Sequence, residues 1–287
     1  MRKLITRIAP SPTGNLHIGT ARTAYLNWLA AKSTGGRFVL RIDDTDIDTS
    51  DPIYTTNIID SLDWLGLDYD VRVDSSDRSD IYKDYLDRID PKYLIKDDGC
   101  VRLSIPTDMI RDNWKDSLGR RPIKTSDFDR NSISNMVLIK SNGLPTYNFQ
   151  SVVDDIDLDI NCIIRGTDHI GNTLKQITLF DLLNKEIPDF YHVGLIHNMQ
   201  GKKLSKRDGD MSITEYKNTG YSKDALLNFI LRIGWSPRDP NMNGIIDQDM
   251  ALNMFWDSGK MSNSSAKMDL DKLDWYNRKY NNIDTGE

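Results

Sequence analysis

Apolar runs and helical stripes alternate along the first part of the chain. Residues 4–8 form a short apolar run that ends at two prolines and a glycine, a pattern that predicts a strand followed by a turn. A helix is expected over residues 17–31, and Gly35 and Gly36 would end it. Residues 37–42 combine β-branched and aromatic side chains, which favours a second strand. A strand, a helix and a strand in succession form a βαβ unit, so the sequence predicts a parallel sheet with a right-handed crossover.

This alternation breaks in the middle of the chain and then returns. Residues 53–65 have apolar positions at helical spacing and predict a second helix. Between residues 85 and 145 the βαβ alternation is lost, and two apolar runs there predict a small inserted module with antiparallel strands. The later elements are expected to be a strand at 160–164, a helix at 172–183, a strand at 191–196 and a mostly helical segment from 216 onward, with helices over 224–233 and 272–280.

The composition is that of a globular protein with a buried core. The chain has 287 residues, of which 38% are hydrophobic and 28% are charged. Cys100 and Cys162 lie far apart in the sequence, so they support neither a disulfide framework nor a Cys-x-x-Cys zinc site, and we expect a reduced cytoplasm. No apolar run approaches the roughly 20 residues of a membrane span, and we expect no membrane partner.

The net charge of −6 argues against a protein that coats nucleic acid without selection. A polynucleotide substrate is still compatible with this charge, because phosphate binding needs a local basic patch rather than a basic total. Two such patches are present in the sequence: Arg120, Arg121 and Lys124 in one stretch, and Lys202, Lys203, Lys206 and Arg207 in another.

The turn after the first strand has the features of an anion site. A helix that starts at such a turn offers free N–H groups and the positive end of its dipole. His17 and Thr20 are three residues apart and share one helix face, and Gly19 leaves room for a flat base or a sugar. The alternative is that Asn15 or Thr13 simply caps the helix and His17 is incidental.

A second candidate site is the basic run at residues 203–207. It follows Gly201 and precedes an Asp-Gly pair, so we expect it on a loop. Lys203 and Lys206 would neutralise the charge that develops on a triphosphate as its α–β bond breaks. A loop can close on ATP and open to release pyrophosphate. The alternative for a run of this kind is a solvated basic loop.

These two segments resemble the "HIGH" and "KMSKS" signatures of class I aminoacyl-tRNA synthetases. Further segments resemble the glutamyl-tRNA synthetase family more specifically, and they occur in the family's order along nearly the whole chain. They are residues 7–14 (RIAPSPTG), 41–46 (RIDDTD), 145–148 (PTYN), 152–155 (VVDD), 164–169 (IRGTDH) and 225–228 (ALLN).

The resemblance implies a site for glutamate and a site for ATP. Arg7 and Arg165 would clamp the carboxylates of the amino acid, and Asp43 would receive its α-ammonium group. Taken alone, Arg7 is as readily a surface charge at a strand end, and Tyr147 more readily a core residue. The implied glutamate-binding residues are Arg7, Ala9, Ser11, Asp43, Tyr147, Ser151 and Arg165. The implied ATP-binding residues are Pro10, Ser11, Gly14, His17, Gly19, Thr20, Leu204, Ser205, Lys206 and Arg207, with His17, Thr20, Lys203 and Lys206 as the catalytic group.

The chain departs from the family at three positions of this site. The family usually has Glu where this chain has Asp43, which is shorter by one methylene, and usually Glu where it has Thr167. Ser151 stands where many members have Asn or an apolar residue. Full-length bacterial members also continue into a helical anticodon-binding region, so the resemblance implies a truncated form. Each departure bears on specificity, but the two arginines are kept, and glutamate is the expected amino acid.

The expected fold is α/β: a Rossmann-like parallel-sheet nucleotide-binding domain with an inserted acceptor-binding module and a helical C-terminal segment. The expected segments are 1–84 and 146–215 for the two halves of the catalytic domain, 85–145 for the module and 216–287 for the helical stem-contact segment. No protein metal ligand is expected, since Mg²⁺ would be held by the phosphates of ATP. We expect a monomer with tRNA and glutamate as partners.

Two other functions stay open at this point. One is a ligase that modifies a base of a tRNA, as the family's paralogue does when it glutamylates queuosine in the aspartate tRNA. The other is a catalytically silent tRNA-binding relic, against which the presence of His17, Lys203 and Lys206 argues.

Overall fold

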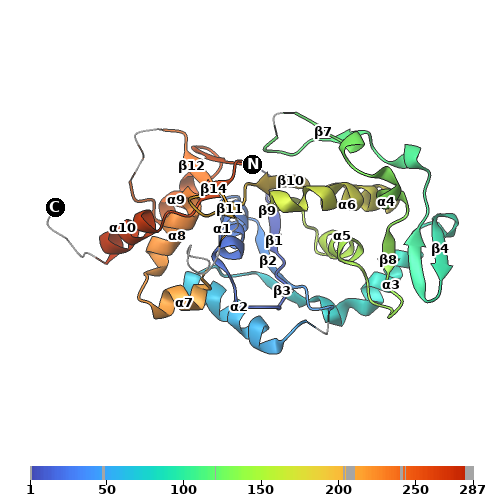
Figure 1. Ribbon diagram of the computed structural model, residues 1–287, viewed down its shortest axis with the longest axis horizontal. Coiled ribbons are helices and arrows are strands. Elements are labelled where there is room, and N and C mark those ends of the chain that lie inside the picture. The colour runs from blue at the N-terminus through green and yellow to red at the C-terminus, as the bar shows by residue number, and fades with distance from the viewer. Residues whose placement is uncertain are drawn as a thin grey trace.

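The computed structural model describes residues 2–46, 49–119, 121–202, 204, 211–239, 242 and 244–281. At its centre lie two groups of parallel strands, ordered β1-β2-β3 and β10-β9. The amide of Asn161 donates to the carbonyl of Ile5 over 3.1 Å, which places β9 beside β1 (Figure 1). The predicted parallel alternation is therefore confirmed. The strands are β1 (Ile5–Ile8), β2 (Arg37–Ile42), β3 (Val71–Asp74), β9 (Cys162–Gly166) and β10 (Asp189–Val193).

Helices cover both faces of these strands, because successive side chains of a buried strand point to opposite sides. On β2, Phe38 and Leu40 belong to the core that includes helix α1, whereas Val39 belongs to a second core on the side of α5 and α6. Gly36 is required before β2, since a Cβ there would lie 1.8 Å from the carbonyl oxygen of Leu4. The helices are α1 (Ile18–Lys32), α2 (Pro52–Leu65), α3 (Ser79–Asp87), α4 (Arg130–Ser134), α5 (Tyr147–Asp157) and α6 (Ile170–Leu182).

The middle of the chain forms antiparallel strands, as predicted. The order β4-β5-β8 is antiparallel throughout, and β6 pairs with β7 in the same way. These strands lie at the end of the molecule opposite the C-terminal helices (Figure 1). The boundaries 85 and 145 stay a prediction. The strands are β4 (Leu94–Asp97), β5 (Cys100–Leu103), β6 (Asn113–Trp114), β7 (Ile123–Lys124) and β8 (Val137–Ile139).

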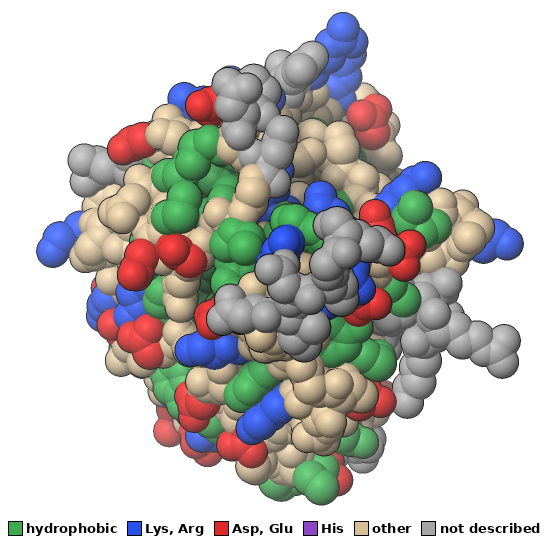
Figure 2. Space-filling model, turned by 90° about the vertical axis from the view of Figure 1, so that its left-hand side faces the viewer, with side chains coloured by type: hydrophobic (Ala, Val, Ile, Leu, Met, Phe, Trp, Pro, Cys, Tyr) green, Lys and Arg blue, Asp and Glu red, His purple; other side chains and the backbone are tan. Residues whose placement is uncertain are grey.

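The last part of the chain is largely helical, as predicted, and its helices begin at side-chain caps. Ser212 and Glu215 form a capping box at the start of α7, and Ser222 caps α8. Figure 2 shows the end of the molecule that carries these helices, where acidic and basic side chains are interspersed among apolar ones. The elements are β11 (Ile196–His197), α7 (Ile213–Asn218), α8 (Lys223–Arg232), β12 (Trp235–Pro237), α9 (Gln248–Met254), β13 (Gly259–Met261), β14 (Ala266–Lys267) and α10 (Leu270–Tyr280).

Two predicted strands have different bounds in the structure. The strand expected at 160–164 begins instead at Cys162, because Asp159 adopts a left-handed conformation (φ 58°) that completes the turn after α5. The strand expected at 191–196 ends at Val193. The backbone at Gly194 packs against Ser264 so closely that a Cβ would lie 1.9 Å from its carbonyl oxygen. The chain then resumes as β11, which pairs with β14.

The two cysteines lie in different surroundings. Cys162 is fully buried in β9, and burial raises the pKa of its thiol to about 12. Cys100 is partly exposed on β5, where its thiol donates to the carbonyl of Ile139. Among the residues that the structure describes, no helix has the length and apolar character needed to cross a membrane.

Candidate functional site

A cavity of about 710 Å³ opens at the carboxyl ends of β1 and β9, beside the start of α1. Ligands in parallel α/β sheets bind at such places, where the chain leaves neighbouring strands in different directions. Leu204 is the one residue of the expected basic loop that the structure describes; Lys203, Ser205, Lys206 and Arg207 lie outside the described residues. The expected residues that line the cavity are Arg7, Ala9, Pro10, Ser11, His17, Gly19, Thr20, Asp43, Tyr147, Arg165 and Leu204.

Strand pleating brings three arginines to one face of the sheet. Thr6 on β1 points to α1, where its hydroxyl donates to the carbonyl of Asn27, so Arg7 points to the opposite side. Arg41 on β2 shares the face of Val39, and Arg165 on β9 shares the face of Ile163. Each of these arginines stands at or near the carboxyl end of its strand, which is the edge where the cavity opens.

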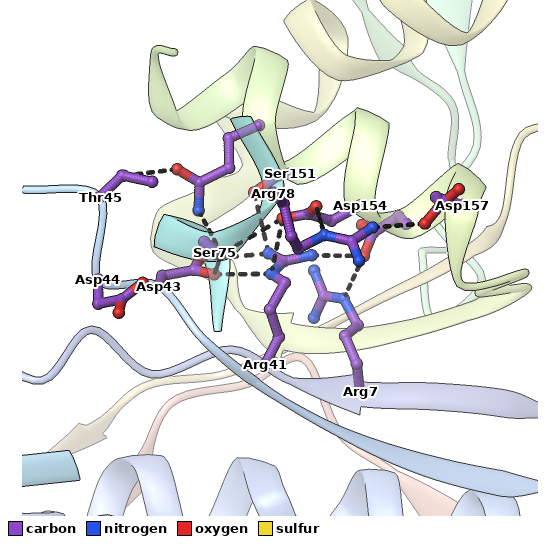
Figure 3. Close-up of polar contacts among 12 residues, drawn as sticks. Arg7, Arg41, Asp43, Asp44, Thr45, Ser75, Arg78, Ser151, Asp154 and Asp157 are labelled. Atoms are coloured by element: carbon purple, nitrogen blue, oxygen red, sulfur yellow. Dashed lines mark hydrogen bonds and ion pairs between the residues drawn. The ribbon is translucent and has the colours of Figure 1, made fainter. Parts of the chain in front are cut away.

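Arg7 and Arg41 share one buried carboxylate from α5. Arg7 Nε donates to Asp155 Oδ1 over 3.1 Å, and Arg41 Nη1 donates to the same oxygen over 2.9 Å. Arg78 extends the cluster by donating to Asp154 over 2.7 Å. Arg41 lies at the centre of this network (Figure 3). The charges largely balance within the cluster, as buried ionic groups require.

Asp43 is held from within the protein. Arg41 donates to both of its carboxylate oxygens, over 2.6 and 3.3 Å, and the hydroxyl of Ser75 donates to Oδ1 over 3.2 Å. Asp43 nevertheless lines the cavity and is 7% exposed. Its carboxylate therefore has a fixed orientation, and its negative charge is already shared with Arg41.

Ser151 and Gly14 are not among the cavity-lining residues. The hydroxyl of Ser151 accepts a hydrogen bond from Arg41 Nη2 over 3.2 Å, and the residue is fully buried behind that guanidinium (Figure 3). Ser151 thus contacts Arg41, the arginine that orients Asp43. It does not itself line the cavity.

Arg165 has a different environment, made of uncharged partners. Its Nε donates to Nε2 of His192 over 3.2 Å, and its Nη2 donates to the hydroxyl of Thr173 over 2.6 Å. Nη1 is buried and makes no hydrogen bond of normal geometry among the described residues, although the nearby side chain of Tyr147 interacts with Arg165 and raises its pKa. Burial lowers the pKa of Arg165 to about 10, so the side chain still carries its charge at neutral pH. A buried N–H of a cation without such a hydrogen bond, at the wall of a cavity, is suited to an anionic ligand.

Tyr147 is the first residue of α5, and its side chain lines the cavity. Its hydroxyl lies 3.2 Å from Nδ1 of His169, and its side chain is among the exposed large residues. Burial and the charge of Arg165 lower the pKa of His169 to about 4, which keeps the ring neutral near pH 7. A core position for Tyr147, the alternative raised by the sequence, is not what the structure shows.

The other end of the cavity is built by the start of α1. His17 is its N-cap residue, exposed and without a side-chain capping bond, so neither Asn15 nor Thr13 occupies the capping position. His17 forms an isolated antiparallel bridge with Ser212, and the amide of Ile213 donates to the carbonyl of Leu16 over 2.8 Å. Leu204, which belongs to the basic run, and Ser212, which follows that run in the sequence, both lie next to this helix start.

Several residues that line the cavity or lie behind its wall were not predicted. Arg22 on α1 is 3% exposed, and its Nη2 donates to the carbonyl of Gly194 over 2.5 Å. An arginine in the middle of an apolar helix face is a signal that could have identified it. Arg41 carried a similar signal, because its strand position has the same parity as the buried Val39. His192 and Asp116 had no sequence signal, since they come together only through tertiary packing.

Within the described parts of the chain, no group of three or more His, Cys, Asp or Glu side chains is arranged to hold a metal ion. Of the two carboxylates that line the cavity, Asp43 pairs with Arg41, whereas Asp168 lies 4.0 Å from Nε2 of His169.

Comparison with known proteins agrees with this geometry. The chain is 39% identical over 321 residues to glutamate–tRNA ligase of Nostoc punctiforme and 38% identical over 315 residues to glutamate–tRNA ligase 1 of Aliarcobacter butzleri. Each alignment covers 96% of this chain and 66% of the relative, so the chain spans about two thirds of their length. A crystal structure of a glutamate tRNA ligase from Elizabethkingia meningosepticum, in complex with its amino acid, superposes with a TM-score of 0.83 at 26% identity. That superposition covers 99% of this chain and 70% of the other.

The family described as tRNA synthetases class I (E and Q), catalytic domain, matches residues 3–96 and 94–275. These two matches span both groups of parallel strands, the antiparallel strands between them and most of the C-terminal helices. Together with the relatives above, they show that the chain belongs to the class I tRNA synthetases of the E and Q group.

Proposed function

We propose that this chain activates glutamate with ATP and transfers the glutamyl group to the 3′ end of a tRNA. The observation that carries the proposal is the pair Arg7 and Arg165, which face one cavity from the neighbouring strands β1 and β9. The same cavity ends at the N-terminus of α1. Two cations suit a dicarboxylate amino acid, and a helix N-terminus suits a phosphate. The relatives named as glutamate–tRNA ligases support this choice.

Three side chains of the cavity would each bind one of the three charged groups of glutamate. Arg165 offers an N–H that makes no hydrogen bond of normal geometry for a carboxylate, and Arg7 offers a second guanidinium anchored by Asp155. Asp43 presents a carboxylate to the α-ammonium group, oriented by its two bonds to Arg41. Ser11 and Tyr147 line the same cavity and would add hydrogen bonds. The role of Ser151 in this proposal is indirect, through Arg41.

In the first step the α-carboxylate of glutamate attacks the α-phosphorus of ATP, and the bond to the β-phosphate breaks to release pyrophosphate. His17 and Thr20 at the start of α1, with Lys203 and Lys206 of the basic run, would stabilise the charge on the transferring phosphate. Pro10, Ser11, Gly19 and Leu204 line the space that the nucleotide would fill. Magnesium, when bound with ATP, would neutralise phosphate charge.

In the second step a hydroxyl of the terminal ribose of tRNA attacks the glutamyl carbonyl, and AMP leaves. The protein needs no nucleophile of its own for either step, because positioning and charge stabilisation suffice. A tRNA acceptor end would be held by the inserted antiparallel strands and by basic side chains such as Arg121 and Lys124. This assignment rests on the family, because the chain resembles the family's members over nearly its whole length.

The test is ATP–pyrophosphate exchange with glutamate, run with and without tRNA. Exchange that depends on glutamate and is lost in Lys206→Ala would support the proposal. A chain that exchanges with no added tRNA would favour a ligase for another acceptor, and one that never exchanges would be a silent relic. Unchanged exchange in Lys206→Ala would show that the basic run is not part of the site. Lys185→Ala, on the rim of a different surface cavity, is the matched control.

A further inference from the structure

His192 is a buried histidine that the proposed chemistry does not use. It lies on β10 directly beside Arg165 in the parallel register, and it is 1% exposed. Trp114 meets its ring edge to face at 5.5 Å, and Phe190 stacks on it at 6.0 Å. The ring is thus shielded from water, and its two nitrogens have only protein partners to satisfy them.

Hydrogen-bond chemistry assigns the proton on this ring. Arg165 Nε is always a donor and lies 3.2 Å from Nε2 of His192, so Nε2 has to be an acceptor. The proton of the neutral ring therefore sits on Nδ1. Nδ1 lies 2.6 Å from Oδ2 of Asp116, which also accepts from the backbone amide of His192 over 3.0 Å. Burial lowers the pKa of His192, which agrees with a neutral ring at pH 7.

Asp116 is itself fixed in place. Its other oxygen, Oδ1, accepts from the backbone amide of Leu118 over 2.9 Å, and the residue is 3% exposed. One carboxylate thus meets three N–H donors, two of them from His192. Asp116 stands between β6 and β7, in the stretch predicted to be the inserted module. Asp116, which lies outside the parallel sheet, therefore forms hydrogen bonds with His192, which lies inside it.

Thr173 on α6 completes the support of Arg165. Its hydroxyl accepts from Arg165 Nη2 over 2.6 Å, and it also lies 2.9 Å from Nε2 of His192 and 3.1 Å from the carbonyl oxygen of His169. With Nε held by His192 and Nη2 by Thr173, two sides of the planar guanidinium are tied to the protein. The remaining nitrogen, Nη1, is the one that makes no hydrogen bond of normal geometry among the described residues, and Arg165 lines the cavity.

We propose that Asp116 and His192 are positioning residues, which select the Nδ1–H tautomer of the ring and so aim Nη1 of Arg165 at a carboxylate of the bound amino acid. This inference rests on the proposed function and deepens it, because it assigns part of the selectivity for an acidic amino acid to residues that do not touch it. Neither residue is a catalytic group.

The kinetic test compares three variants in the exchange assay. His192→Phe keeps a flat ring but removes the acceptor for Arg165, and should raise the KM for glutamate about tenfold, the value of one buried hydrogen bond to a charged group. The KM for ATP should not change. His192→Gln restores an acceptor at the position of Nε2 and should recover most of the loss. Asp116→Asn should give an intermediate value, because an amide cannot accept from all three donors.

Asp181→Asn is the matched control, since Asp181 pairs with the exposed Arg111 on the outer side of α6. A wild-type chain that exchanges, with a glutamate KM unmoved by His192→Phe, would overturn the positioning role while leaving the proposed function intact. Equal losses in His192→Phe and His192→Gln would also overturn it, because the acceptor would then not matter.

A spectroscopic test does not depend on activity. In a chain with ¹⁵N-labelled histidine, His192 should show a protonated Nδ1 and an unprotonated Nε2 at pH 7, with His192→Gln used to assign the signals. Asp116→Asn should reduce the population of that tautomer. An Nε2–H tautomer or a charged ring in the wild type would refute the inference, whatever the exchange assay shows. If the wild type shows no exchange, the proposed function fails and this spectrum still decides the positioning role.

Discussion

Arg7 and Arg165 face the same cavity from neighbouring strands, yet the two are held in opposite ways. Arg7 donates to Asp155, a carboxylate it shares with Arg41, so its charge is met inside the protein. Arg165 is held by a neutral histidine and a hydroxyl, and burial lowers its pKa to about 10. The first arrangement balances charge inside the fold, and the second leaves a positive charge that a ligand would meet in the proposed function. A buried cation without a counter-ion is costly, and a bound carboxylate would relieve that cost.

The largest effect is expected when the carboxylate that pairs with Arg7 loses its charge. Asp155→Asn keeps the shape of the side chain but leaves Arg7 and Arg41 with one negative charge fewer, and should lower the free energy of unfolding by about 3–5 kcal/mol. Urea denaturation would measure it. Asp157→Asn is the control, because Asp157 pairs with Arg78 at a partly exposed position and should cost less than about 1 kcal/mol. Equal losses in the two variants would show that burial of the shared carboxylate is unimportant.

For Arg165, whose partners are neutral, a substitution is expected to change the binding of glutamate rather than the stability of the fold. Arg165→Gln should raise the KM for glutamate at least about 30-fold, equal to about 2 kcal/mol, since it removes one partner of a buried ion pair formed with the ligand. Arg7→Gln should raise it less, because Asp155 already offsets the charge of Arg7. Steady-state exchange kinetics would measure both, with Arg111→Gln as the control. A larger increase in the KM for glutamate in Arg7→Gln than in Arg165→Gln would contradict this prediction.

A smaller effect is expected for Ser151. Its hydroxyl makes one of several contacts to Arg41, so Ser151→Ala should cost about 1 kcal/mol of stability and change the KM for glutamate less than about threefold. The same exchange assay and a thermal melt would test this. A large increase in KM without loss of stability would mean that Ser151 contacts the amino acid directly, as the family resemblance implied.

The smallest expected effect concerns His169, whose pKa is lowered to about 4 by burial and by the charge of Arg165. Because the folded pKa lies below the ordinary value of 6.5, the folded chain binds the proton less well than the unfolded one. This contribution to stability is full above about pH 6.5 and is lost as the pH falls toward 4.

In Arg165→Gln the pKa of His169 should rise toward its ordinary value, and in Arg7→Gln it should rise less. An NMR titration of His169 would measure both shifts, with His169→Gln to assign the signal. An unchanged pKa in Arg165→Gln would mean that burial alone sets it.

Local patterns predicted the scaffold of the site well. The β1–α1–β2 unit followed from an apolar run, a helical stripe and a β-branched run, because each of these elements buries its own periodic face. The parallel sheet followed in turn, and with it the position of Arg7, Arg165 and the start of α1 around one cavity. Strand ends were less accurate, since they depend on backbone features such as the positive φ of Asp159 and the close contact at Gly194.

The interior of the site was not predictable in the same way. The helix α5 was not predicted, so the sequence could not tell that Ser151 lies behind Arg41 while Tyr147, four residues earlier, reaches the cavity. Arg41 was included only as part of a matching segment. The links from Asp155 to Arg7 and from Asp116 to Arg165 join residues far apart in the chain, and no periodicity encodes such contacts.

The contrast between the two cysteines has a practical consequence. Cys162 is closed off in β9 with its thiol pKa raised to about 12, so little thiolate forms there near neutral pH. Cys100 stands partly exposed on β5, and these are the only two cysteines in the sequence. A maleimide dye should therefore label the antiparallel strands selectively in the native chain. Fluorescence anisotropy of that dye would report directly on whether an added RNA engages this part of the molecule.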